Sequence, residues 1–156
     1  MLRDISAHST AYAARCKTFQ LREWRRHGFL EGIGARDGKG HVFDAAEAVR
    51  IALAYLLARY GFGFREAFAF VSERGDQIDD LVRATSKGTK AKSDHILTFS
   101  IDQDLSRPFA SITGAPLART RFETKSVGAL QVNVSHVVRD TVDRLAFHQN
   151  HGGYDE

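Results

Sequence analysis

The chain has 156 residues, of which 43% are apolar and 26% charged, with 22 Lys and Arg against 19 Asp and Glu. This length accommodates one ordinary domain or two small ones, and a content of 11 Phe with only 2 Pro excludes a disordered or linker-like chain. The single cysteine, Cys16, excludes an internal disulfide framework and a Cys-rich zinc module, and it favours a reducing compartment. No apolar run approaches the roughly 18 residues of a membrane span, and the N-terminus lacks a signal-peptide core, so we expect a cytoplasmic protein.

The excess of positive charge is concentrated in one short segment. Residues 15–41 contain 7 basic and 3 acidic side chains, whereas residues 76–156 contain 10 and 11. A local excess of this kind favours an anionic partner near residues 15–41. By itself, the count is explained equally well by an ordinary solvated basic surface.

The first predicted elements are two helices. Residues 4–14, rich in Ala and small polar side chains, predict a short helix. Residues 18–30 predict an amphipathic helix with an apolar side and a basic side, and Gly28 is its stop signal. We assign Phe19, Leu21 and Trp24 to the apolar side and Arg22, Arg25 and Arg26 to the basic side.

A hairpin and a series of helices follow. Residues 35–43 predict a tight hairpin with its turn at Asp37-Gly38. Asp44 and Glu47 have the spacing of a capping box and predict the start of a long helix that ends at Gly61. Its apolar stripe consists of Val49, Leu53, Leu56, Leu57 and Tyr60. A second helix is predicted from Phe64 with Gly75 as its stop, and a third over residues 76–84.

The period of the pattern changes from helical to alternating in the C-terminal half. Residues 85–94 are basic and polar and predict a flexible linker. Strands are predicted near residues 96–101, 109–113 and 129–134. A last helix, capped by Ser135, has Val138, Val142 and Leu145 on one face. We therefore expect an α+β protein with an N-terminal domain over residues 1–84, the linker, a small α+β module over residues 95–148 and a tail over 149–156.

Three stretches of the N-terminal half follow one another in a characteristic order. They are residues 21–30, LREWRRHGFL, residues 40–44, GHVFD, and residues 56–67, LLARYGFGFREA. Together they resemble the winged helix-turn-helix DNA-binding domain of the MerR family. The first is similar to the family's Leu-Arg-x-aromatic-x-Arg-x-Gly-Leu-Leu stretch, the second to its wing and the polar cap that follows, and the third to the junction of its next helix pair. The resemblance implies an α+β fold in which the helix over residues 17–27 reads DNA and the hairpin over residues 35–43 forms the wing.

The chain also departs from the family pattern. Arg15-Cys16-Lys17 replaces the usual Gly-Val-Ser turn, and Val42 stands where a wing arginine is usual. The long dimerisation helix has no counterpart in residues 76–93, and the effector cysteines of metal-sensing members are missing. We therefore expect no metal or other cofactor.

The resemblance and the basic pattern together define the candidate DNA-binding residues. A helix that enters the major groove needs short polar residues at its start and long basic residues along its exposed side. Thr18 and Gln20 are the candidates for base contacts, and the basic side chains would mainly bind phosphates. The predicted set is Lys17, Thr18, Gln20, Arg22, Arg25, Arg26, Arg36, Lys39 and His41. We expect the Trp24 ring to pack against the helix over residues 44–60 rather than to contact DNA.

Other kinds of site have less support in the sequence. No nucleophile-and-base pattern is present, so no enzymatic activity is expected. His148 and His151 are close in sequence but lie in a polar tail, where a frayed terminus is a better interpretation than a metal site.

These observations predict a nucleoid-associated transcription regulator that binds double-stranded DNA. Because palindromic sites need a two-fold partner, we expect a homodimer formed through residues 95–148, with binding of an effector or a partner protein as the alternative role of that module. Alternatives for the whole chain are an excisionase-like architectural DNA-binding protein, a protein-interaction adaptor on the same scaffold, and an RNA-directed role of the basic linker.

Overall fold

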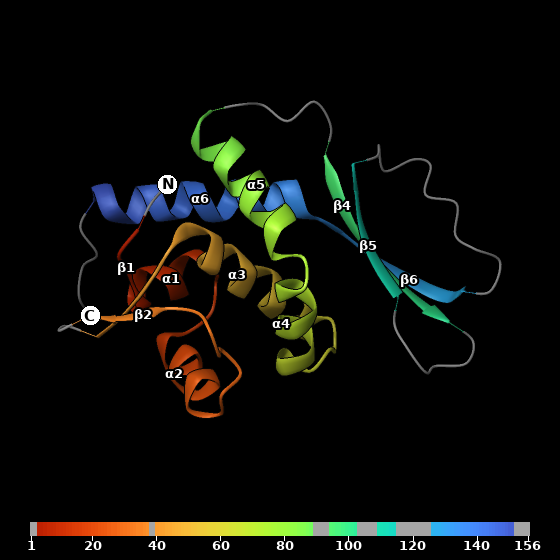
Figure 1. Cartoon of the computed structure of the whole chain (residues 1–156), viewed down its shortest axis with the longest axis horizontal. Coiled ribbons are helices and arrows are strands. Elements are labelled where there is room, and N and C mark those ends of the chain that lie inside the picture. The colour runs from red at the N-terminus through yellow and green to blue at the C-terminus, as the bar shows by residue number, and fades with distance from the viewer. Residues whose placement is uncertain (1–2, 38–39, 89–93, 103–108, 115–125, 152–156) are drawn as a thin grey trace. The chain divides into compact units, whose positions relative to one another are not determined.

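The computed structural model describes residues 3–37, 40–88, 94–102, 109–114 and 126–151 (Figure 1). The chain has an α+β fold and divides into two compact units. The first unit is formed by residues 1–89 together with residues 137–156, and the second by residues 90–136. This differs from the expected module over residues 95–148, because most of the last helix belongs to the first unit.

The first unit combines helices with a small three-stranded antiparallel sheet of order β1-β3-β2. In the sheet, Ile5 is opposite Phe43 and Arg36 is opposite His41. Its elements are β1 (Ile5–Ser6), α1 (Ala7–Ala13), α2 (Thr18–Arg26), β2 (Ala35–Asp37), β3 (Gly40–Phe43), α3 (Ala45–Arg59), α4 (Phe64–Ser72), α5 (Gly75–Ser86) and the greater part of α6 (Val134–Asn150).

Helix α3 is the centre of the first unit. It begins with the predicted capping box, in which Asp44 Oδ1 accepts the Glu47 N–H at 2.8 Å and Glu47 Oε2 accepts the Asp44 N–H at 2.9 Å. Nine of its fifteen residues are buried, including Ile51, which lies outside the predicted stripe. A helix that is apolar on most sides is typical of a core position. Tyr60, the last residue of that stripe, is exposed instead.

Several predicted boundaries in this unit are wrong. Ile5 and Ser6 form strand β1, so the first helix begins at Ala7 rather than at residue 4. Gly75 does not end α4, which stops at Ser72, but is the first residue of α5. Helix α5 continues to Ser86, so the helix occupies the first two residues of the expected linker, of which residues 89–93 lie outside the described part of the chain.

The second unit is a three-stranded antiparallel sheet of order β5-β4-β6. Its strands are β4 (His95–Asp102), β5 (Phe109–Gly114) and β6 (Ser126–Asn133), which confirms the three predicted strands. Leu97 is opposite Ile112 on one side and Val132 on the other. Asn133, not Ser135, caps α6, because Asn133 Oδ1 accepts the His136 N–H at 2.9 Å. Ser135 Oγ accepts the His95 N–H at 2.9 Å and so binds the helix start to β4.

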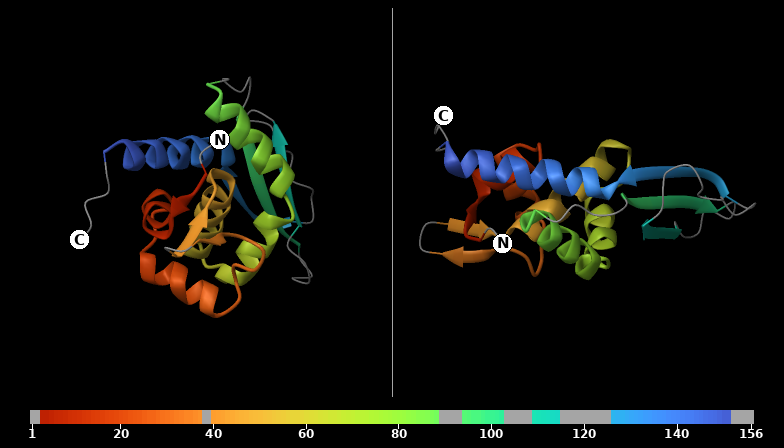
Figure 2. Two further views of the ribbon diagram at one scale, coloured as in Figure 1. Left: turned by 60° about the vertical axis from the view of Figure 1, so that its left-hand side comes forward. Right: turned by 90° about the horizontal axis from the view of Figure 1, so that it is seen from above.

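From Val137 onward, α6 belongs to the first unit, where it lies beside α1 (Figure 2). Its predicted apolar face is buried, with Val138 and Leu145 fully inaccessible and Val142 nearly so. Arg144 donates to the Tyr12 carbonyl oxygen at 2.8 and 3.2 Å, and Ser9 Oγ lies 3.1 Å from His148 Nδ1. Among the described residues, no helix is long and apolar enough to cross a membrane.

Candidate nucleic-acid interface

The turn between α1 and α2 determines how α2 is presented. The Cys16 N–H donates to the Ala11 carbonyl and the Arg15 N–H to the Tyr12 carbonyl, the two hydrogen bonds of a Schellman motif. This motif needs a left-handed residue, usually glycine, and here it is Arg15 with a φ of 59°. The Arg15 side chain forms two hydrogen bonds of 3.0 and 2.9 Å with Asp140 of α6, which raise the pKa of Arg15.

The inner face of α2 is packed against α3 and α4. Leu21 is buried, and the Trp24 ring is stacked on Phe64 with 3.7 Å between centroids and 6° between planes. Tyr55 of α3 lies 5.7 Å from the same indole ring. The expected packing of Trp24 against the helix over residues 44–60 is therefore confirmed, and α4 contributes the closer contact.

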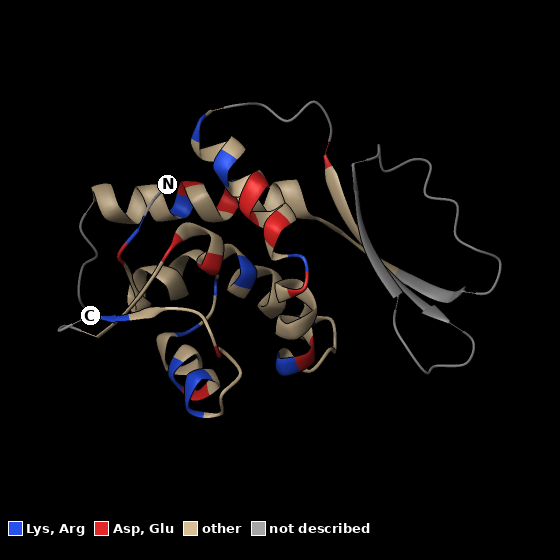
Figure 3. Cartoon of the chain, viewed as in Figure 1, with Lys and Arg blue, Asp and Glu red and all other residues tan. Residues whose placement is uncertain are grey.

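The outer face of α2 is mainly basic, and Figure 3 marks the basic and acidic positions along its ribbon. Arg22 and Arg26 are both exposed, as is Lys17 immediately before the helix. Arg26 forms an ion pair of 2.6 Å with Glu23, but both partners are on the surface, where such a pair is weak and is readily exchanged. Lys17 therefore lies just before the helix, and Arg22 and Arg26 lie on its solvent-facing side. The opposite side of the helix is packed in the core.

Arg25 is not on this open face, although it was predicted as a DNA contact. Its Nη2 donates to the Ile33 carbonyl at 3.0 Å and to the Gly34 carbonyl at 3.2 Å. Its guanidinium also lies over the Phe43 ring, and burial lowers the pKa of Arg25, an effect that Glu47 opposes. Arg25 therefore holds the glycine-rich loop after α2, which leaves it little freedom to bind a phosphate.

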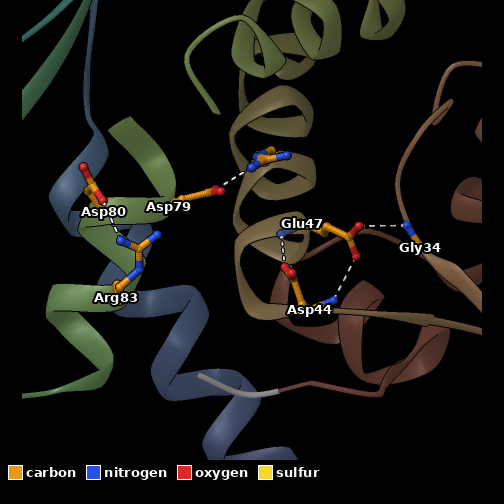
Figure 4. A network of polar contacts seen from close by, with 7 residues as sticks. Gly34, Asp44, Glu47, Asp79, Asp80 and Arg83 are labelled. Carbon is orange, nitrogen blue, oxygen red and sulfur yellow. Dashed lines mark hydrogen bonds and ion pairs between the residues drawn. The ribbon is translucent and has the colours of Figure 1, made fainter. Parts of the chain in front are cut away.

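The same loop is fixed from α3. Glu47 Oε1 accepts the Gly34 N–H at 2.9 Å while its other oxygen caps the helix, so one carboxylate joins the loop to the start of α3 (Figure 4). Gly34 has a φ of 73°, and a Cβ there would lie 2.9 Å from the Phe43 ring. Only glycine fits both the backbone conformation and this close approach.

Two predicted base-contact residues lie at the start of α2. The Gln20 Oε1 accepts the Lys17 N–H at 2.9 Å, so bidentate pairing of Gln20 with adenine would have to share this oxygen. Thr18 is half-buried, with its Oγ1 3.5 Å from His8 Nδ1 of α1. Both residues are thus partly engaged in holding the first turn of α2.

Arg36 and His41, two of the predicted contacts in the hairpin, differ in exposure. Arg36 is exposed on β2. His41, directly opposite on β3, is half-buried, and its Nδ1 is a buried atom with no hydrogen-bond partner among the described residues. Lys39 lies outside the described residues. Of the two wing contacts that the structure describes, Arg36 is therefore the more exposed.

Phe19 is the residue of this surface that the sequence interpretation missed. We assigned it with Trp24 to the apolar side, but its side chain is exposed, at 59% of its full accessible area. Phe19 precedes Arg22 by three positions and Arg26 by seven, which is the spacing of one helical face. Trp24 is five positions from Phe19 and lies on the other face. The 3.6-residue period of the helix was therefore the signal that could have predicted the exposure of Phe19.

The remaining sequence candidates form no further site. His148 packs against the rings of His8 and Tyr12, and His151 stacks on Phe147. No group of three or more potential metal ligands occurs in the described part of the chain. Cys16 is half-buried, and burial raises the pKa of its thiol to about 11, as expected for an unreactive residue in the turn.

No protein-family model matches this sequence, and no curated protein is significantly similar to it.

Proposed function

We propose that the first unit is a winged helix-turn-helix domain that binds double-stranded DNA as a transcription regulator. In this proposal α2 enters the major groove and the β2–β3 hairpin contacts the flanking backbone. The observation that carries it is the division of α2 into two faces. Leu21 and Trp24 fix one face in the core, while Arg22 and Arg26 present the other to solvent.

The arrangement of elements supports the same function. A short helix, a turn of residues 14–17 and a second, exposed helix are followed by a hairpin and by the core helix α3. A helix presented in this way fits the major groove, where basic side chains on its flanks bind phosphates. Lys17, Arg22, Arg26 and Arg36 are the exposed cations that we assign to phosphate contacts.

Arg25 has a different part in this proposal. It acts as a positioning residue, because its hydrogen bonds to the Ile33 and Gly34 carbonyls set the path of the chain from α2 into the hairpin. Thr18 and Gln20 remain candidates for base contacts at the N-terminal end of α2, with Lys39 and His41 as further hairpin contacts.

The test is a salt titration of duplex binding with paired variants. Because about four phosphate contacts per protomer release counterions, the logarithm of the binding constant should fall with the logarithm of salt concentration with a slope of roughly −3 to −4 per protomer. Arg22→Ala with Arg26→Ala should weaken binding at least ten-fold and reduce this slope by about 2.

The matched control is Arg83→Ala with Lys87→Ala, which removes two exposed charges from the end of α5. This control should bind as the unchanged chain does. If it loses binding to nucleic acid while the α2 variant keeps it, the basic segment after α5 is the binding element. If neither pair changes duplex affinity, the DNA-binding function is wrong.

The oligomeric state on DNA is tested by selecting bound fragments from random duplex DNA. We propose that the protein acts as a homodimer through its second unit, and a palindromic selected site would support this two-fold arrangement. A single asymmetric site bound by one chain would contradict it.

A further inference from the structure

Phe19 lies opposite the buried face of α2, about 160° around the helix from Leu21 and about 140° from Trp24. With successive residues about 100° apart, Phe19, Arg22 and Arg26 fall within an arc of about 60°. The side chain of Phe19 is 59% exposed, and the Lys17 ammonium lies 6.0 Å from its ring centroid. An aromatic side chain thus lies beside cations that we assign to phosphate contacts, and the Glu23 carboxylate, which pairs with Arg26, is about 40° away on its other side.

Packing within the protein does not explain why Phe19 occupies this exposed position. The inner face of α2 is already filled by Leu21 and by Trp24, which stacks on Phe64. Phe19 points away from this core and retains most of its accessible surface. Its apolar area is therefore available to a partner that approaches α2 from the side of Arg22 and Arg26.

We propose that Phe19 is a specificity-determining residue that recognises thymine through its 5-methyl group, an inference that rests on the proposed DNA-binding function. Of the base edges in the major groove, only that of thymine presents a methyl group, and the partner that suits it is an apolar side chain. A phenyl ring has no hydrogen-bonding group and cannot read the donor and acceptor pattern of the other edges.

The surrounding charges determine where the ring is placed. Arg22 and Arg26 lie on the same face as Phe19, and Lys17 lies beside it at the start of the helix. Cations that bind phosphates fix the register and orientation of a helix on the duplex. With these contacts made, Phe19, which lies opposite the buried face of the helix, is directed into the groove.

The experiment replaces thymine by uracil, which lacks only the methyl group. A duplex selected with the full chain is substituted at one thymine at a time, and affinities are measured for the unchanged chain and for Phe19→Ala. At one position per half-site, uracil should weaken binding of the unchanged chain about four-fold, as expected for the loss of one buried methyl group. Phe19→Ala should bind the thymine duplex more weakly and should bind the thymine and uracil duplexes equally at that position.

Tyr60→Ala is the matched control, since Tyr60 is a similarly exposed aromatic residue at the end of α3, with 62% of its area accessible. It should retain both the affinity and the preference for thymine. Trp24, the only tryptophan, gives a fluorescence signal that verifies the fold of both variants.

The outcomes separate this inference from the proposed function. If Phe19→Ala keeps the thymine preference at every position, or if the unchanged chain has none, the role of Phe19 is wrong even when binding still depends on Arg22 and Arg26. If the unchanged chain binds no duplex at all, both the role of Phe19 and the DNA-binding function are wrong.

Discussion

The Trp24 and Phe64 rings lie face to face, with centroids 3.7 Å apart and planes inclined by 6°. This contact joins α2 to α4. We expect Trp24→Ala to lower the free energy of unfolding by about 2–3 kcal/mol, somewhat less than for a fully buried tryptophan because Trp24 is half-buried. Urea unfolding followed by circular dichroism at 222 nm measures this change.

The control for this prediction is Tyr60→Ala, which removes an exposed aromatic ring and should change stability by no more than about 0.5 kcal/mol. Equal effects of the two substitutions would mean that the Trp24 stack contributes nothing specific to the position of α2.

Two glycines of the loop after α2 form a natural comparison. Both have a positive φ, 78° at Gly32 and 73° at Gly34. A Cβ at Gly32 meets nothing within 4 Å, so Gly32→Ala should cost only the left-handed strain of about 1 kcal/mol. A Cβ at Gly34 would lie 2.9 Å from the Phe43 ring and 3.1 Å from Arg25 Nη1, so Gly34→Ala should cost at least 1 kcal/mol more.

Thermal unfolding of the two glycine variants checks this order. If Gly32→Ala proved the more destabilised, the close approach of the loop to Phe43 and Arg25 would not be present in solution.

Arg15 combines a favourable side-chain contact with an unfavourable backbone conformation. Arg15→Ala keeps the left-handed strain and loses the hydrogen bonds to Asp140, so it should destabilise the protein by about 0.5–1 kcal/mol, a value limited by the exposure of the pair. Arg15→Gly also loses the pair but relieves strain of about 1 kcal/mol and should be close to the unchanged chain in stability.

Denaturant midpoints of the two Arg15 variants give the comparison. A glycine variant less stable than the alanine variant would contradict the left-handed conformation of Arg15.

The Cys16 thiol offers a test that depends on pH. Its pKa is raised to about 11 by burial, so at pH 8 the folded chain should react with iodoacetamide about 100-fold more slowly than the unfolded chain, whose thiol has a pKa near 9. Because the neutral thiol is favoured in the fold, its contribution to stability is complete below about pH 9 and is lost as the pH rises towards 11.

Cys16→Ala serves as the control for the pH dependence of stability, since it should show less loss of stability than the unchanged chain between pH 9 and 11. Rapid alkylation of the folded chain at pH 8 would show that the thiol is not buried.

Local signals predicted much of the fold. The capping box of Asp44 and Glu47, the hairpin pairing over residues 35–43 and the alternation in β4 and β6 each depend on neighbouring residues, and each was found in the structure. Gly38 of the predicted turn lies outside the described residues. Strand β1 was missed because two residues carry no measurable period, and its existence depends on pairing with the distant β3.

The candidate surface was predicted less completely, because the charge of a residue does not determine whether its side chain faces solvent or the protein interior. Arg25 and Arg26 are adjacent in sequence, yet Arg25 turns inward to the Ile33 and Gly34 carbonyls while Arg26 faces solvent. The acceptors of Arg25 lie eight and nine residues further along a glycine-rich loop whose path no short-range pattern specifies. Phe19, by contrast, was open to prediction from the helical period.

The return of α6 to the first unit means that this unit is discontinuous in the chain. A fragment that stops at Thr89 lacks Asp140, Arg144 and His148, which bind Arg15, the Tyr12 carbonyl and Ser9. The second unit is therefore an insertion in the first, joined to it by the chain at both of its ends. The smallest part of this protein that can be expected to fold as the first unit must carry both flanks of the insertion.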